Sequence, residues 1–491
     1  MKLKSMALAL GMIGFAAPGF ATTGMNLEGY GAISTGMGGA AMAFDVGASG
    51  MINNPATIGF LKSGGSRLDV GLGALSPSMS SSGTDAASNT FYMPAFGYIR
   101  KDGNIAWGIG MAAQGGMGAE YSSPAAMYGT LNSTNLVAPI AFGPTVAPTA
   151  LRQKSEVGVL RVMLPISYQA SDALNIGGSI DYVSAGMDIQ WLLDGPHFGD
   201  LMPGAGNTFG RASNSIATTF GGALAPGDQI HYGYFNFNTD SQFSQRAKGD
   251  GWAANLGFTY KVSPALTVGG VYHAKTSLGD MKTGSSDASI TFDATVAGFG
   301  GAVNFPVVGQ IVIKNFQWPE TIGLGFSYQY NDKWQFVGDY KRINWSGVMK
   351  SFNMSFIAAP AASQPNPLAT GLVAGGGTQL DVEYFQNWKD QDVVMLGAAY
   401  RLSDQTTLRF GGSFSSNPVP NQFVTPLFPA TTKNHFMFGF GHAFDKSNAL
   451  DFSLSYAPKV TVTNNWSAAG GTNQTIGHSQ LNWQLTYGHQ F

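Results

Sequence analysis

Histidine is the side chain in this sequence best suited to bind a metal or move a proton, and its seven copies are scattered. They are His197, His231, His273, His435, His442, His478 and His489. None has the His-Glu-x-x-His spacing that places two zinc ligands and a general base on one helix face. No Gly-x-Ser-x-Gly sequence is present either. We therefore expect no metal, no cofactor and no enzymatic activity, although a lipid hydrolase whose Ser and His meet only on folding stays an alternative.

The glycine-rich run Gly115-Gly116-Met117-Gly118 has the composition of a phosphate-binding loop. It lacks the Lys-Ser or Lys-Thr pair of such loops and does not stand between a strand and a helix. It follows an expected strand at 104–113, and glycines in such a place mark bulges and kinks. We predict a kink in the third strand.

The amino terminus reads as a targeting segment. Lys2 and Lys4 precede the apolar stretch 6–17, and Pro18-Gly19-Phe20-Ala21 offers small residues for cleavage. This pattern predicts a secretory signal peptide over residues 1–21, too short to span a bilayer. No other stretch approaches twenty apolar residues, so no transmembrane helix is expected.

The composition is unusual for a soluble domain. Charged residues make up 11% of the chain, against about 25% in ordinary soluble proteins. Cysteine is absent despite the predicted export, so no disulfide contributes to stability. The net charge of −2 offers no basic surface for nucleic acid.

The last thirteen residues show the pattern that dominates the chain. Leu481, Trp483, Leu485 and Tyr487 alternate with polar residues up to the terminal Phe491. On an extended strand, alternate side chains point to opposite faces. Apolar residues toward lipid and polar residues toward a lumen are typical of a transmembrane barrel strand.

Similar alternation recurs along residues 65–491. Candidate strands are 66–75, 91–100, 104–113, 156–169, 173–190, 249–261, 265–280, 317–331, 333–346, 388–402, 404–414, 432–445, 447–460 and 479–491. Short turns separate the members of a pair, whereas segments 115–155, 191–248, 281–316 and 347–387 read as long polar loops. This asymmetry predicts an all-β, antiparallel transmembrane barrel of about 14 strands, with both termini in the periplasm.

Residues 22–64 precede the barrel and show no period of two. Small residues and glycine dominate, and Asn54-Pro55-Ala56 lies near the end of the segment. Small residues let backbone pack tightly, so we predict a plug, or hatch, in the lumen. A flexible periplasmic tail is the alternative.

These features together resemble the FadL/TodX family of outer-membrane transporters of hydrophobic compounds. The resemblance is carried by 24–61 with Asn54-Pro55-Ala56, by 319–328 (PETIGLGFSY), by 387–390 (NWKD) and by 449–452 (ALDF). It implies passive uptake of long-chain fatty acids or hydrocarbons across the Gram-negative outer membrane, with release sideways through the barrel wall. It also implies a monomer whose terminal Phe491 is read by the barrel-assembly machinery, surrounded by outer-membrane lipid and lipopolysaccharide.

The resemblance also implies which residues act. The ligand pocket would include Thr23, Gly24, Met25, Leu27 and Lys350, and the lateral opening would lie at a kink formed by Ala112, Gly115, Gly116, Met117 and Gly118. The segment 182–186 has no arginine where the fatty-acid transporter carries one, so a neutral hydrocarbon is as good a substrate as a fatty acid. A structural or adhesin-like barrel that binds a partner through its long loops is the alternative function.

Overall fold

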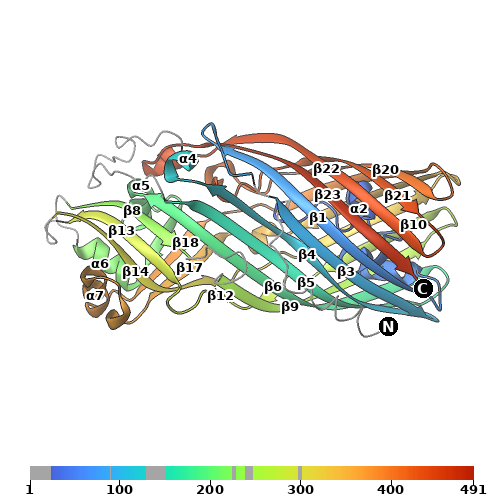
Figure 1. The fold of residues 1–491 in the computed structure, drawn as a ribbon, viewed down its shortest axis with the longest axis horizontal. Coiled ribbons are helices and arrows are strands. Elements are labelled where there is room, and N and C mark those ends of the chain that lie inside the picture. Colours follow the sequence, from blue (N-terminus) through green and yellow to red (C-terminus); the bar gives the residue numbers. More distant parts are fainter. Residues whose placement is uncertain (1–23, 89, 129–150, 224–227, 238–246, 297–300) are drawn as a thin grey trace.

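A computed structural model describes residues 24–88, 90–128, 151–223, 228–237, 247–296 and 301–491. The predicted signal peptide and Thr23 lie outside these residues. All strands of the described part belong to one hydrogen-bonded sheet, which curls into an elongated barrel (Figure 1). Of the helices in this part, none is both long and apolar enough to cross a bilayer.

The barrel closes through antiparallel pairs between neighbouring strands, and β23 pairs with β1. In order around the wall the strands are β1 (Ser66–Ser81), β3 (Phe91–Asp102), β4 (Ile105–Tyr121), β5 (Gln153–Gln169), β6 (Leu174–Asp194), β9 (Ala247–Lys261), β10 (Leu266–His273), β15 (Thr321–Gln329), β16 (Trp334–Ile343), β19 (Gln391–Arg401), β20 (Thr406–Ser415), β21 (Asn434–Ala443), β22 (Asn448–Thr463) and β23 (Thr475–Gln490). Each strand expected from the alternation overlaps one of these.

The expected total of about 14 strands is wrong for the sheet as a whole. The sheet of the described residues contains 23 strands, because nine strands are present in addition to those just named. The additional strands are β2 (Thr84–Asp85), β7 (Gly210–Ser213), β8 (Gln229–Asn236), β11 (Ser277–Leu278), β12 (Met281–Lys282), β13 (Ala288–Val296), β14 (Gly301–Lys314), β17 (Ser351–Ala358) and β18 (Gln379–Phe385). Most lie in segments expected to be polar loops. Beyond the carboxyl end of β6, they extend the wall through the pairs β6–β8, β8–β13, β13–β14, β14–β17, β17–β18 and β18–β7.

Short helices lie in the amino-terminal segment and in the connections. They are α2 (Ala32–Gly36), α3 (Gly50–Asn53), α4 (Pro124–Tyr128), α5 (Gly195–Leu201), α6 (Asn214–Ala223) and α7 (Pro367–Ala374), with 3-10 turns η2 (Gly47–Ser49), η3 (Pro55–Phe60), η5 (Trp345–Gly347), η6 (Ala361–Ser363), η7 (Asn421–Phe423) and η8 (Trp466–Ala469). The expected loop 115–155 is corrected at both ends, because β4 continues to Tyr121 and β5 begins at Gln153.

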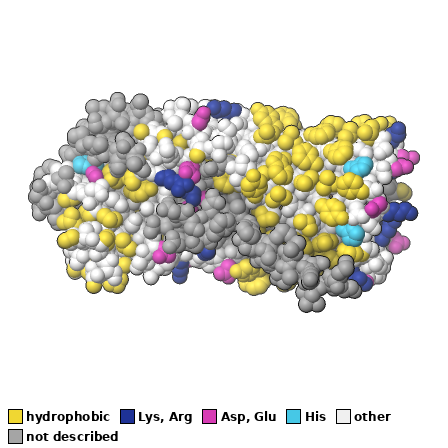
Figure 2. Space-filling model, viewed as in Figure 1, with side chains coloured by type: hydrophobic (Ala, Val, Ile, Leu, Met, Phe, Trp, Pro, Cys, Tyr) yellow, Lys and Arg dark blue, Asp and Glu magenta, His cyan; other side chains and the backbone are white. Residues whose placement is uncertain are grey.

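The two faces of the wall have opposite character, as the alternation predicts. Leu481, Leu485 and Tyr487 are exposed on the outside, whereas Asn482 and Gln484 are buried inside. Figure 2 shows apolar side chains covering the part of the outer surface at the right of the view, with charged groups gathered at the adjoining end. An apolar band bounded by polar groups is the surface that a barrel presents to lipid.

Several charged side chains of the wall are buried inside the barrel with partners. Arg161 and Asp181 form a buried ion pair of 2.8 Å, and Arg409 and Asp451 another of 2.8 Å. Asp339 accepts hydrogen bonds from two backbone N–H groups of the amino-terminal segment. A carboxylate removed from water needs such partners, since an unpaired buried charge is strongly destabilising.

The amino-terminal segment (residues 24–64) packs against the inner wall. Asn54 takes the extended conformation expected before Pro55, and its Oδ1 accepts from Ala56 N at 3.1 Å. Its Nδ2 donates to Met42 O within the segment and to Phe258 O on β9. One side chain thereby caps η3 and ties the segment to the wall.

Candidate functional site

An apolar cavity lies inside the barrel, at the end that carries the additional strands; this end is called the upper end below. Four methionines, one from the amino-terminal segment, contribute to it: Met25, Met117, Met187 and Met349. Aromatic side chains form much of the remaining lining: Trp191, Phe316, Phe352, Tyr384, Trp388 and Phe428. Its volume is about 30 Å³. Because methionine side chains are flexible and polarisable, they can adjust to ligands of different shape.

Few polar atoms lie near this cavity. Gln386 lines the cavity and is buried. The hydroxyl of Tyr384 and the indole nitrogens of Trp388 and Trp191 are buried without a hydrogen-bond partner in the described part of the protein. Burial, followed by the charges of Asp194 and Asp200, raises the pKa of the Tyr384 hydroxyl, so this group stays protonated.

The amino-terminal residues are seated on the kink in β4. Asn26 forms an isolated antiparallel bridge with Gly115, and Gly116 N donates to Met25 O at 3.1 Å. A Cβ on Gly115 would stand 2.0 Å from Met25 O, so only glycine permits this approach. The β4–β5 register shifts between Ala113 and Gly115, at the place where the kink was predicted.

Two tryptophans contact residues 24–26 from the side opposite β4; the position of these residues against Gly115 is called the seat below. Trp318 Nε1 donates to Asn26 Oδ1 at 2.6 Å, and a Cβ on Gly24 would meet the ring of Trp345. Met25 and Leu27 stand on either side of Asn26, which forms the bridge. Met25 lines the apolar cavity, and Leu27 lines two others below it.

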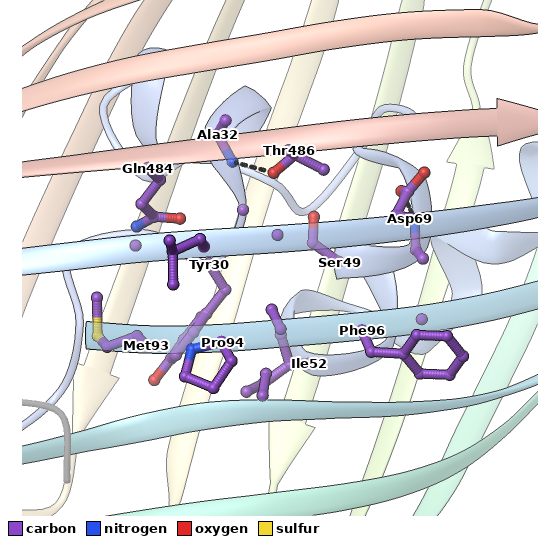
Figure 3. Close-up of a pocket in the computed structure, with 18 of the residues that line it drawn as sticks. Tyr30, Ala32, Ser49, Ile52, Asp69, Met93, Pro94, Phe96, Gln484 and Thr486 are labelled. Atoms are coloured by element: carbon purple, nitrogen blue, oxygen red, sulfur yellow. Dashed lines mark hydrogen bonds between the residues drawn. The ribbon is translucent and has the colours of Figure 1, made fainter. Parts of the chain in front are cut away.

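One lower cavity, of about 70 Å³, lies between the amino-terminal segment and the wall (Figure 3). Its lining includes Leu27, Tyr30, Ile52, Met93, Pro94 and Ala112. Figure 3 shows Tyr30 and Ile52 of the segment beside Met93 and Pro94 of β3. This cavity therefore adjoins the wall at β3 and β4.

The hydrogen-bonded ladder between β3 and β4 ends at this cavity. Ala95 and Ala112 form the last described pair, although β3 begins at Phe91 and β4 runs on to Tyr121. Further up, the two sides meet again where Ala87 N donates to Glu120 O at 2.8 Å. We call the edges 91–94 and 113–119 the window, because they face each other without a ladder.

The structure brings together many of the predicted residues. Met25 and Met117 meet in the apolar cavity, and Leu27 and Ala112 meet in the cavity below. Lys350 instead lines a separate groove of about 500 Å³ with Lys275, and only its neighbour Met349 reaches the apolar cavity. Among the described residues, no three His, Asp or Glu side chains are grouped to hold a metal.

The aromatic lining was missed from the sequence. Tyr384, Gln386 and Trp388 follow a period of two, but they lie where a polar loop and the start of a strand were expected. Trp191 and Phe316 come from expected loops as well. The alternation at 384, 386 and 388 was the available signal. It does not show which other segments supply the rest of the cavity lining.

A family model and the similar solved structures point to the same protein family. A model of outer membrane protein transport proteins (OMPP1/FadL/TodX) matches residues 10–486. The toluene transporter TbuX of Ralstonia pickettii is 27% identical with a TM-score of 0.71, over 95% of this chain and 99% of that chain. The toluene transporter TodX of P. putida is 26% identical with a TM-score of 0.76, over the same shares of the two chains.

A further relative is an uncharacterized protein of Chlorobium limicola, encoded in the 5′ region of a phosphoenolpyruvate carboxykinase gene. It is 51% identical over 79 residues, so the match spans 16% of this chain and 39% of the relative's length. The family model and the two toluene transporters describe transport proteins rather than enzymes. With a family match over nearly its whole length, this chain belongs to the OMPP1/FadL/TodX family of outer-membrane transport proteins.

Proposed function

We propose that this protein passively takes hydrophobic small molecules across the outer membrane and releases them sideways through the window. The observation that carries the proposal is the position of Met25–Leu27. This stretch lies between the apolar cavity and the cavity behind the β3–β4 edges. A molecule that displaced it could pass from one cavity to the other without meeting bulk water.

The driving force is the transfer of apolar surface out of water. Burial of apolar surface stabilises a bound solute by about 25 cal/mol per Å². The methionine and aromatic lining supplies this environment at the extracellular half of the barrel, where a water-filled pore would not. Because the bilayer core is equally apolar, release through the wall costs the solute little, and no energy source is needed.

Neutral aromatic hydrocarbons are the substrate class that we favour. The related TbuX and TodX are toluene transporters. No Lys or Arg lines the apolar cavity in the described part, so a fatty-acid carboxylate would have no cationic partner there. Burial of an unpaired carboxylate is costly. Long-chain fatty acids are therefore the second choice.

Orientation and assembly follow from the barrel ends. Phe491 N donates to Ser66 O at 2.9 Å, so the first wall strand and the carboxyl end meet at the same rim. Short turns at 101–104, 170–173 and 403–405 belong to this end of the strands. We propose that this rim is periplasmic and that a monomer is the working unit, because the barrel closes within one chain.

Cross-linking of the window tests lateral release. Cysteines replacing Pro94 and Ala113 stand on opposite edges, and a bismaleimide between them would close the gap. The same reagent on Ala95→Cys/Ala112→Cys joins residues that already form the last ladder pair. We expect toluene uptake by cells to fall at least tenfold with the first pair and stay near wild type with the second.

Equal uptake in both cross-linked proteins would contradict lateral release. The adhesin-like alternative makes a different prediction. Deletion of residues 361–377, which contain α7, would abolish partner binding while hydrocarbon uptake continued.

A further inference from the structure

Three polar side chains form a stripe on one wall of the apolar cavity. Tyr384 lies in β18, and Gln386 and Trp388 follow β18 on either side of Asn387, whose φ of 46° interrupts the extended backbone. All three side chains nevertheless line the apolar cavity. We call these residues the polar stripe.

The polar stripe is short of hydrogen-bond partners. The Tyr384 hydroxyl and Trp388 Nε1 are buried and unpaired in the described part of the protein. Gln386 is 8% exposed, and none of the described residues bonds its side-chain amide. Elsewhere in the same region a comparable indole is satisfied, since Trp345 Nε1 donates to Gln391 Oε1 at 3.1 Å.

Unpaired groups of this kind are unusual in a folded protein. More than nine-tenths of buried polar groups find a partner, and an exception calls for an explanation. A hydrocarbon bound among the methionines would leave the amide and the hydroxyl unpaired. A ligand that carries one oxygen atom would satisfy at least one of them.

The chemistry of the lining restricts that oxygen. No cationic side chain of the described part lines the cavity, so a carboxylate is disfavoured. The amide of Gln386 and the hydroxyl of Tyr384 can both donate and accept, whereas the indole of Trp388 only donates. An uncharged hydroxyl or carbonyl oxygen suits this set.

Resting on the proposed function, we propose that the apolar cavity selects aromatic molecules bearing one uncharged oxygen, such as aromatic alcohols and ketones. The ring lies among Met25, Met117 and Met187, and the oxygen bonds to Gln386 and Tyr384. Hydrocarbons use the same cavity but gain only the apolar contacts.

Binding of a matched ligand pair tests this selection. Toluene and benzyl alcohol differ by one hydroxyl group, and benzoate adds a charged arm. Calorimetric titration of the full chain in lipid nanodiscs measures binding without competing detergent. We expect benzyl alcohol to bind wild-type protein more tightly than toluene although it is less hydrophobic, and benzoate to bind least.

Substitutions then identify the groups responsible. Gln386→Met and Tyr384→Phe keep size but remove the polar atoms. Each should lower the affinity for benzyl alcohol, relative to the affinity for toluene, about three- to tenfold, the range expected for one hydrogen bond. The control Gln405→Met changes an exposed glutamine in a turn at the other end of the barrel and should alter neither affinity.

The outcomes separate the two proposals. If toluene binds and the variants lose both ligands equally, or lose neither, selection by the polar stripe is wrong while hydrocarbon uptake stands. If wild-type protein binds neither toluene nor benzyl alcohol, the proposed function itself is wrong and the selection falls with it.

Discussion

Trp318 donates a 2.6 Å hydrogen bond from its indole nitrogen to the side-chain oxygen of Asn26, joining residues 292 positions apart. Trp318 precedes β15 in the barrel wall, whereas Asn26 belongs to the amino-terminal segment. Both side chains are buried. Together with the Asn26–Gly115 bridge, this bond holds the segment between two opposite parts of the wall.

Trp318→Phe removes that bond and leaves the Asn26 oxygen unpaired. A buried acceptor without a partner costs about 1–3 kcal/mol, so Met25–Leu27 should leave its seat more often. We expect Leu27→Cys, in this background, to react faster with a small maleimide than in the protein with Trp318. Trp334→Phe, at the other end of the barrel, is the control, and equal rates in all three would show that the bond does not restrain the segment.

Gly115→Ala tests the seat from the side of the wall. The new Cβ would lie 2.0 Å from the carbonyl oxygen of Met25, and backbone cannot move away as a flexible side chain can. We expect a folded barrel in which hydrocarbon uptake falls several-fold. Gly371→Ala adds the same methyl group where nothing lies within 4 Å, and it should behave as wild type. Normal uptake by Gly115→Ala would mean that the seat has no part in transport.

Asn54→Ala with Pro55→Ala should loosen the tie between the amino-terminal segment and β9. The change removes three hydrogen bonds of the Asn54 side chain and frees the backbone at position 55. We expect a normal amount of heat-modifiable barrel, but reduced uptake of toluene and of a long-chain fatty acid at equal surface expression. Uptake equal to wild type for both solutes would make this segment inert filler.

Deletion of Phe491 should impair assembly rather than transport. The side chain is 70% exposed. Among the described aromatic contacts, its ring packs only against His489, with 4.4 Å between the ring centroids. Its loss therefore removes little core packing. We expect less folded barrel in the outer membrane at native expression, with unchanged uptake per folded molecule. An undiminished folded yield would show that Phe491 is no assembly signal.

Single cysteines test the orientation of the barrel, since the chain contains none. Ser363 is exposed beside α7, and Asp404 is exposed in the turn between β19 and β20. An impermeant maleimide on intact cells should label Ser363→Cys and not Asp404→Cys. The opposite result would invert the assignment of the periplasmic rim.

The sequence determined the wall strands of this protein because each strand carries its own pattern. Leu481, Leu485 and Tyr487 face outward through the local geometry of an extended chain, whatever the neighbouring strand is. The extended conformation of Asn54 before Pro55 was predictable for the same reason, since it is a backbone property of two adjacent residues.

Only the tertiary structure decided what meets inside. The apolar cavity joins Met25 to Phe316 and Trp388, and the window exists because the β3–β4 ladder ends at Ala95 and Ala112. The additional strands escaped detection because the segments that contain them, which were expected to be polar loops, gain a partner only when β6, β8, β13 and β14 line up. Pairing between distant segments depends on packing of the whole chain, and alternation along a single strand does not specify its neighbour.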